Sequence, residues 1–303
     1  MISFRYHLVS IVAVFLALAL GVVVGTTVVN QGIVDDLRRR TDAAVDSSDK
    51  LKTQIAELNS RLDASRSFEN IVMPLLIKDQ LTGAEVLVVT QQDVSASDVD
   101  SVRRALIDGG ASVLAEIVVT NRMALSDSTS QAALAGALGT VNSRVPEELA
   151  KEAARAVGAR LANGPGLAPS DVLSSLDSAG FVVLRGGTGI SGIGGGAQAV
   201  VLLLGTTRPP VVDPGFFMAP LAAALVEAQR PVAAAETETT AAPFVPLLRD
   251  DGSLDGQLVT VDDADNMVGR LALVLGLRDL LASPGRGGDY GVKAGASALL
   301  PKP

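Results

Sequence analysis

The sequence predicts an α/β protein in which a transmembrane helix and a coiled-coil stalk precede a mostly parallel sheet. Three observations support this fold class. A charge-free apolar run lies near the N-terminus, a weak heptad repeat follows it, and short apolar strands then alternate with helical stretches through the rest of the 303-residue chain. Strands that are buried on both faces are continuous apolar runs, and alternation of strands with helices favours a parallel sheet covered on both sides.

The apolar run extends from Leu8 to Val29 without a charged side chain. A helix of this length, at about 1.5 Å per residue, covers roughly 33 Å and can cross a hydrocarbon core of about 30 Å. A cleaved signal peptide is the alternative, because Ala17-Leu18-Ala19 resembles a cleavage site. That tripeptide lies inside the apolar run, however, and signal peptides have apolar cores of only about 7–15 residues. A buried soluble helix is disfavoured because no face of the run is polar. We therefore expect an uncleaved anchor in residues 1–32.

Basic residues flank the apolar run on both sides. Arg5 precedes it, and Arg38, Arg39 and Arg40 follow it. Lys and Arg near the ends of a span tend to stay in the cytoplasm, which on a literal count would place the C-terminal body inside. The rule weakens for long translocated domains, so these residues leave the side of the membrane open.

A heptad repeat can be written from Val34 to Val72, and it predicts a coiled-coil stalk over residues 33–73. The stretch that fits the heptad best has apolar residues spaced by four, three and four positions. These residues would form the line of contact between two helices, which we call the seam, and the charged residues lie away from it. A membrane helix that leads into a heptad favours a parallel homodimer, and a small-xxx-small pair in the apolar run would let two helices approach closely. A single amphipathic helix that packs on the body is the alternative. The expected dimer interface consists of Gly21, Gly25, Leu51, Ile55, Leu58 and Leu62.

Pro74 is expected to end the stalk, because its ring and missing N–H disfavour a continuing helix. The body, residues 74–283, should then form one α/β domain. We predict strands at 84–90, 111–120, 181–184, 200–204, 230–235 and 258–261, and helices at 97–108, 130–138, 147–161, 170–179, 217–228 and 267–281. Residues 284–303, rich in Gly and Ala, should form a mobile or surface-tracing tail.

Composition excludes several kinds of function. The chain has a net charge of -8, and no basic stripe offers the counterion release that a nucleic-acid partner requires. It contains no cysteine, hence no disulfide, thiolate metal site or cysteine nucleophile. The single histidine, His7, lies at the membrane edge, which removes histidine-dependent triads and histidine metal sites from the body. We therefore expect neither a catalytic site nor a metal site built by the body's own residues.

A glycine motif resembles a dinucleotide-binding fingerprint. Gly187, Gly189 and Gly192 follow an apolar strand, and Asp213 lies about twenty residues further on. Such a site also needs a helix that begins directly after the glycines and faces the pyrophosphate. Here three more glycines follow and then a strand, so we interpret the segment as a mobile connection between strands and expect no bound nucleotide.

An acidic cluster, Asp262, Asp263 and Asp265, follows the last predicted strand and precedes the helix at Met267. Carboxylates at the carboxyl end of a sheet can bind a hard cation. Acidic residues before a helix also cap its free N–H groups and complement its dipole. We favour capping, because it explains the position without a ligand.

Two ends of the chain resemble one family. The opening MISFRYHLVSIVAVFLALALGVVVG and the closing GRGGDYGVKAGASALLPKP are similar to the actinobacterial MctB family, the mycobacterial copper transport protein B group. The stretch from Val261 to Leu277 is similar to that family's last strand and helix. The family usually has a histidine before the Tyr-Gly of the tail, where this chain has Asp289, so one copper ligand is replaced.

The resemblance implies a body outside the cytoplasmic membrane, with the outer membrane proposed for the family. It implies a role in copper efflux or homeostasis, and copper enters as a ligand only through it. The alternative, from related SteB-type proteins, is an envelope scaffold that binds a second membrane protein and regulates septal peptidoglycan hydrolysis and cell separation. The residues themselves predict a non-enzymatic dimeric envelope module, and a nucleotide-binding enzyme is the least supported alternative.

Overall fold

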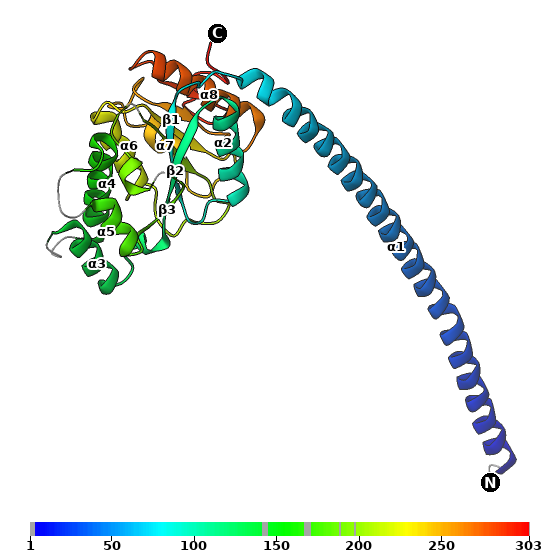
Figure 1. Ribbon diagram of the computed structural model, residues 1–303. Coiled ribbons are helices and arrows are strands. Elements are labelled where there is room, and N and C mark those ends of the chain that lie inside the picture. The colour runs from blue at the N-terminus through cyan, green and yellow to red at the C-terminus, as the bar shows by residue number, and fades with distance from the viewer. Residues whose placement is uncertain (1–3, 141–144, 167–170, 188, 197, 303) are drawn as a thin grey trace. The chain divides into compact units, whose positions relative to one another are not determined.

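A computed structural model describes residues 4–302 except 141–144, 167–170, 188 and 197 (Figure 1). The chain divides into two compact units, Met1–Phe68 and Glu69–Pro303. The long helix α1, Phe4–Ile77, forms most of the first unit and ends in the second. Each unit is described by itself.

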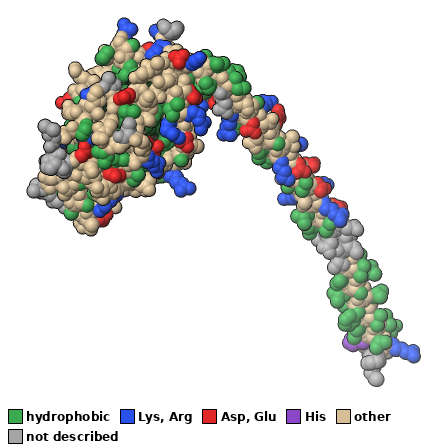
Figure 2. All heavy atoms as spheres, in the orientation of Figure 1, with side chains coloured by type: hydrophobic (Ala, Val, Ile, Leu, Met, Phe, Trp, Pro, Cys, Tyr) green, Lys and Arg blue, Asp and Glu red, His purple; other side chains and the backbone are tan. Residues whose placement is uncertain are grey.

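The first unit begins with an apolar stretch of α1 that has the length and composition of a membrane span. Residues Arg5–Gly25 have a mean hydropathy of 2.9, and none of this stretch is buried. Hydrophobic side chains surround this part of α1, and charged side chains replace them further along the helix (Figure 2). There, ion pairs one turn apart, such as Arg40 with Asp36 at 2.8 Å and Arg61 with Glu57 at 2.6 Å, support the solvated helix. An N-terminal apolar helix of this kind suggests a membrane anchor, as the sequence predicts.

The expectation that Pro74 ends the helix is wrong, because α1 continues through Pro74 to Ile77. A proline inside a helix removes one backbone hydrogen bond and disfavours the helix by about 3 kcal/mol. Packing explains why the helix continues. Met73 and Ile77 are 6% and 0% exposed and lie in a core cluster of the second unit.

The second unit contains a seven-stranded sheet in the order β3-β2-β1-β4-β5-β6-β7. All pairings are parallel except β2 with β3. The mostly parallel α/β fold that the sequence predicts is therefore confirmed. The strands are β1 Glu85–Gln91, β2 Ser112–Val119, β3 Val182–Arg185, β4 Ala199–Leu204, β5 Val232–Glu236, β6 Val259–Val261 and β7 Gly288–Tyr290.

Helices cover both faces of the sheet and bury two separate cores. Along β1, Leu87 and Val89 lie in one core, and Val86 and Val88 lie in the other, as the alternation of a strand requires. The first core packs against α3 Ser128–Leu138, α4 Pro146–Asn163, α5 Val172–Ser178, α6 Met218–Glu227 and α7 Val245–Arg249. The second packs against the end of α1, α2 Ala96–Asp108 and α8 Met267–Ala282.

The C-terminal tail differs from the expectation of a mobile or surface-tracing segment. Its residues Gly288–Tyr290 form β7, which pairs in parallel with Val259–Val261 of β6. The strand at 258–261 is therefore not the last strand of the fold, and the tail extends the sheet by one more strand. Residues 84–90, 111–120 and 200–204 were expected as strands, and β1, β2 and β4 lie there.

Candidate functional site

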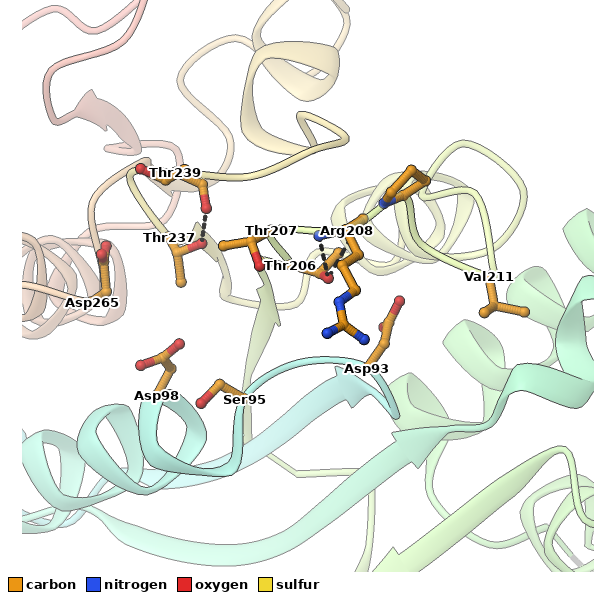
Figure 3. A pocket seen from close by; sticks show the side chains of 12 residues that line it. Asp93, Ser95, Asp98, Thr206, Thr207, Arg208, Val211, Thr237, Thr239 and Asp265 are labelled. Atoms are coloured by element: carbon orange, nitrogen blue, oxygen red, sulfur yellow. Dashed lines mark hydrogen bonds between the residues drawn. The ribbon is translucent and has the colours of Figure 1, made fainter. Parts of the chain in front are cut away.

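The sheet has a topological switch point between β1 and β4. From β1 the chain moves to β2 on one side, and from β4 it moves to β5 on the other. In open α/β sheets, ligands bind at the carboxyl ends of the strands at such a point. A cavity of about 660 Å³ lies here, lined by residues that follow β1, β4, β5 and β6 (Figure 3). We name it the switch-point cavity. Its lining consists of Asp93, Ser95, Asp98, Gly205, Thr206, Thr207, Arg208, Pro209, Val211, Thr237, Thr239 and Asp265.

Short connections after the strands place these side chains. Asp93 and Ser95 lie between β1 and α2, and Asp98 lies in the first turn of α2. Gly205 directly follows β4 at a φ of 144°, and a Cβ there would collide with the side chain of Thr237. The loops after β4 and β5 therefore meet closely only because residue 205 is glycine.

The cavity wall is held by local hydrogen bonds. The Thr237 hydroxyl donates to the carbonyl of Thr239 at 3.1 Å, and the backbone N–H of Arg208 donates to the Thr206 hydroxyl at 3.2 Å. The backbone N–H of Glu238 donates to Asp265 Oδ1 at 2.7 Å. The wall thus presents ordered hydroxyl and carboxylate groups.

Negative charge accumulates on one side of the cavity, where Asp98 and Asp265 lie (Figure 3). Burial raises the pKa of Asp98, and the charge of Asp265 raises it further. A hydrogen bond from Ser97 and the charge of Arg270 act in the opposite direction. The two carboxylates therefore repel each other, and a positive group near both would be stabilised.

A second polar group joins the tail to the sheet. We name it the tail-binding cluster: Glu236, Arg249, Asp262 and Lys293. Arg249 Nη1 lies 2.6 Å from Asp262 Oδ2, and both side chains are almost fully buried. The backbone N–H groups of Val292 and Lys293 donate to Asp262 Oδ1 at 2.7 and 3.1 Å. Lys293 Nζ donates to Glu236 Oε1 at 2.7 Å. The cluster fixes the segment that follows β7.

The predicted capping role of Asp262, Asp263 and Asp265 is wrong. The cap of α8 is Asn266, whose side chain accepts a hydrogen bond from the Gly269 N–H at 3.0 Å. Asn266 directly precedes the first helical residue and is placed to reach that N–H, whereas Asp262 binds the tail and Asp265 binds the Glu238 N–H. Asp263 is 1% exposed, and its Oδ1 has no hydrogen-bond partner among the described residues.

The substitution Asp263→Asn should raise the midpoint of thermal unfolding at pH 7. Burial raises the pKa of Asp263 above its ordinary value of 3.8, and the neighbouring acids Asp262, Asp265 and Glu238 add to this effect against a hydrogen bond from Asn266. The folded state therefore favours the neutral side chain. The wild-type protein loses folding stability as the pH rises through the folded-state pKa of this carboxyl. The gain from asparagine should vanish below about pH 3.8, where the carboxyl is protonated in both states. Calorimetric scans between pH 3 and 8 measure it, with the exposed Asp255→Asn as the control. A gain independent of pH would contradict this explanation.

The glycine motif does not have the structure of a nucleotide site. Gly189 is followed by a short 3-10 turn, Ile190–Gly192, and no long helix begins there. Arg160 holds the segment by donating to the carbonyls of Ile190 and Ile193 at 3.0 and 2.5 Å. The described part of this connection is thus bonded to α4, which differs from the expected mobile connection; Thr188 and Ala197 lie outside the described residues.

The donors in the body do not suit Cu(I), which prefers thiolate, thioether and imidazole ligands. The chain has no cysteine. Met73 lies in one core cluster and Met123 and Met218 in the other, where they pack against apolar side chains. Asp289, at the position where the resemblance places a histidine, accepts a hydrogen bond from the Thr260 hydroxyl at 2.7 Å. Within the described part of the chain, no three His, Cys, Asp or Glu side chains gather to hold a metal ion.

All six residues of the predicted dimer interface lie on α1. A Cβ at Gly21 or Gly25 would meet nothing within 4 Å. The seam residues are exposed in the single chain, with exposed fractions of 56% for Leu51, 58% for Ile55, 63% for Leu58 and 48% for Leu62. Pairing of two such helices remains a prediction. The sequence reasoning missed the switch-point cavity, although polar residues lie within two positions of the end of each strand that borders it.

The fold and these features define the class: an α/β protein with a seven-stranded sheet and one N-terminal apolar helix of membrane-spanning length. The family described as "Copper transport outer membrane protein, MctB" matches residues 1–301, and the chain belongs to this family. It is 28% identical over 314 residues to "Copper transporter MctB" of Mycobacterium tuberculosis (strain ATCC 25618 / H37Rv). It is 27% identical over 321 residues to the protein of the same name from Mycobacterium leprae (strain TN). Each alignment covers 99% of both chains. The family is named for transport, which is not an enzymatic activity.

Proposed function

We propose that the protein is a single-span anchor module that supports copper efflux or copper tolerance as a parallel homodimer, with its α/β unit outside the cytoplasmic membrane. The stalk helices pair, and each pair presents two α/β units to a second envelope protein. The observation that carries the dimeric part of this proposal is the exposed apolar seam at Leu51, Ile55, Leu58 and Leu62 on the same helix as the apolar span.

Anchoring supports the pairing. Two chains held in one membrane by their N-terminal helices meet in parallel, and their equivalent stalk residues then face each other. Burial of a leucine or isoleucine side chain contributes about 1.5–3 kcal/mol, so four such positions on each helix favour association. We propose the outer membrane as the membrane that holds the apolar helix, because the family description names it.

The copper role is proposed from the names of the mycobacterial relatives. Because the body has no cysteine or histidine and Met73, Met123 and Met218 are packed in its cores, we propose that copper passes through a partner and that this protein supports the partner instead of binding the ion tightly. Purified full-length protein in detergent should therefore show no saturable Cu(I) binding below micromolar free copper. Tight stoichiometric binding would contradict this part of the proposal.

The test of function is deletion of the gene followed by growth in graded copper. The deletion strain should tolerate less copper than the parent, and the full chain supplied in trans should restore tolerance. Equal tolerance of the deletion strain and the parent would contradict a role in copper handling. Fractionation of the same cells identifies which membrane contains the protein.

The side chains of the body do not suit copper, and this also favours a second candidate function. In it, the protein is an envelope scaffold that regulates septal peptidoglycan hydrolysis through a membrane partner. It predicts that the deletion strain forms chained or misdivided cells at ordinary copper concentrations. Microscopy of the same strain distinguishes the two functions. Capture of the intact protein from solubilised membranes would then identify the partner.

Single cysteines in the stalk test the geometry, because the native chain has none. In membranes, Leu51→Cys and Leu62→Cys should each form an intermolecular disulfide under mild oxidation, since equivalent seam residues of parallel helices come within disulfide range. Ser60→Cys, on the opposite side of the helix, should remain largely monomeric on a non-reducing gel. A disulfide at only one of the two seam positions would indicate crossed or antiparallel helices.

A further inference from the structure

The switch-point cavity is not explained by the copper role or by the stalk. Its volume of about 660 Å³ is in the range of small-molecule sites, and it lies where open α/β sheets bind ligands. Its lining includes five Ser or Thr side chains, three Asp and one Arg among twelve residues, and no aromatic side chain. Recognition there must therefore depend on hydrogen bonds and charge, not on ring stacking.

The charges of the cavity are unequal. Arg208 points toward Asp93 in Figure 3, away from Asp98 and Asp265, and it is the one basic residue among the twelve that line the cavity. Asp98 and Asp265 lie at the other end, on α2 and before α8, and burial together with the charge of Asp265 raises the pKa of Asp98. Arg270 also lies near Asp98, but its guanidinium donates to the carbonyl of Asp265 and to Glu69. A ligand with a positive group would therefore be held at the Asp98 end.

A buried hydroxyl lies at the same end of β1. Thr90 is 2% exposed, and its Oγ1 has no hydrogen-bond partner among the described residues. Val86 and Val88 pack in the core beside α2 and α8, and strand alternation places Thr90 on that same face. Thr90 is not among the residues that line the cavity, so its hydroxyl is not counted among the contacts of a ligand there.

We propose that the switch-point cavity binds a small hydroxylated primary amine, of the class of amino sugars and amino alcohols, with the ammonium group between Asp98 and Asp265. The ligand hydroxyls would exchange hydrogen bonds with Ser95, Thr206, Thr207, Thr237 and Thr239. An ammonium group has three donors and suits two separated carboxylates. A metal ion fits less well, because among the described residues no three His, Cys, Asp or Glu side chains are placed to hold one.

Calorimetric titration of the full-length protein in detergent tests this inference, with glucosamine and galactosamine as probes and glucose and N-acetylglucosamine as neutral counterparts. The amines should bind saturably and the neutral sugars at least tenfold more weakly, since a hydrogen bond to a charged group is worth about 1.5–3 kcal/mol. Asp98→Asn and Asp265→Asn should each weaken amine binding about tenfold or more. Asp100→Asn, on the exposed side of the same helix, should leave it unchanged.

Four results would overturn the inference. Equal binding of glucose and glucosamine would remove the role of the ammonium group. If the wild type and both cavity variants bind the amine equally, the amine does not bind at Asp98 and Asp265. The absence of any amine binding would have the same meaning. Saturable Mg²⁺ or Ca²⁺ binding that the two variants lose, without an amine response, would assign a cation site instead. Because the assay does not involve copper, its failure is distinguishable from failure of the proposed function.

Discussion

Replacing Asp262 with alanine should lower the free energy of unfolding by about 3–5 kcal/mol, the usual effect of removing one partner of a buried ion pair. The substitution leaves the Arg249 guanidinium, whose side chain is 4% exposed, without its nearest carboxylate. It also removes the acceptor for the N–H groups of Val292 and Lys293. The segment after β7 should therefore detach locally before the rest of the unit unfolds.

Urea unfolding of the full chain followed by circular dichroism measures the change in stability, and hydrogen exchange at Val292 and Lys293 measures the local release. The matched control is Asp255→Ala, an exposed acid in the turn after α7, which should change stability by no more than about 0.5 kcal/mol. Asp262→Asn retains an acceptor for the two N–H groups and should fall between the wild type and Asp262→Ala. Unchanged exchange in Asp262→Ala would show that this carboxylate does not hold the tail.

The double substitution Ile55→Asp with Leu62→Asp should convert the proposed dimer into a monomer and abolish its function in cells. It places four carboxylates in the seam of two paired helices, where they lose apolar burial and repel one another. Light scattering of the detergent-solubilised protein measures the mass, and growth in copper measures the function. The exposed fractions of Ile55 and Leu62, 58% and 48%, indicate that neither substitution disturbs packing within a single chain.

The matched control is Ala56→Asp with Ser60→Asp, which adds the same charges to the same turns but away from the seam. This variant should remain dimeric and active. If the variant with Ile55→Asp and Leu62→Asp is monomeric but fully active, the dimeric mechanism is contradicted. A monomeric wild-type protein would also contradict it.

The sequence predicted the apolar helix and the parallel sheet because these depend on strong local patterns. Val200–Leu204 and Glu85–Gln91 are apolar over most of their length, and only burial on both faces accounts for such strands. The direction of β3 could not be predicted in the same way. Four residues, Val182–Arg185, carry no signal for orientation, and β3 pairs antiparallel with β2.

Long-range contacts explain the features that the sequence analysis missed. Gly288–Tyr290 has the composition of a loop, and it forms a strand because Arg249 and Asp262, far away in sequence, hold its carbonyl and the N–H groups that follow. Pro74 lies in a helix because Met73 and Ile77 are buried. The switch-point cavity combines four separate connections. The one local sign of it was polar residues such as Asp93 and Thr206, each two positions beyond the end of a strand.

The strand β7 has a consequence for the order in which the protein is made. The strand β7 follows every other strand of the sheet along the chain, so the α/β unit cannot be completed until residues 288–290 have left the ribosome. A chain cut short after α8 would keep both hydrophobic cores but leave the backbone of β6 open along one side, and open strand edges promote aggregation. Complete and truncated copies would thus differ at a single exposed edge, by which a quality-control protease could distinguish them.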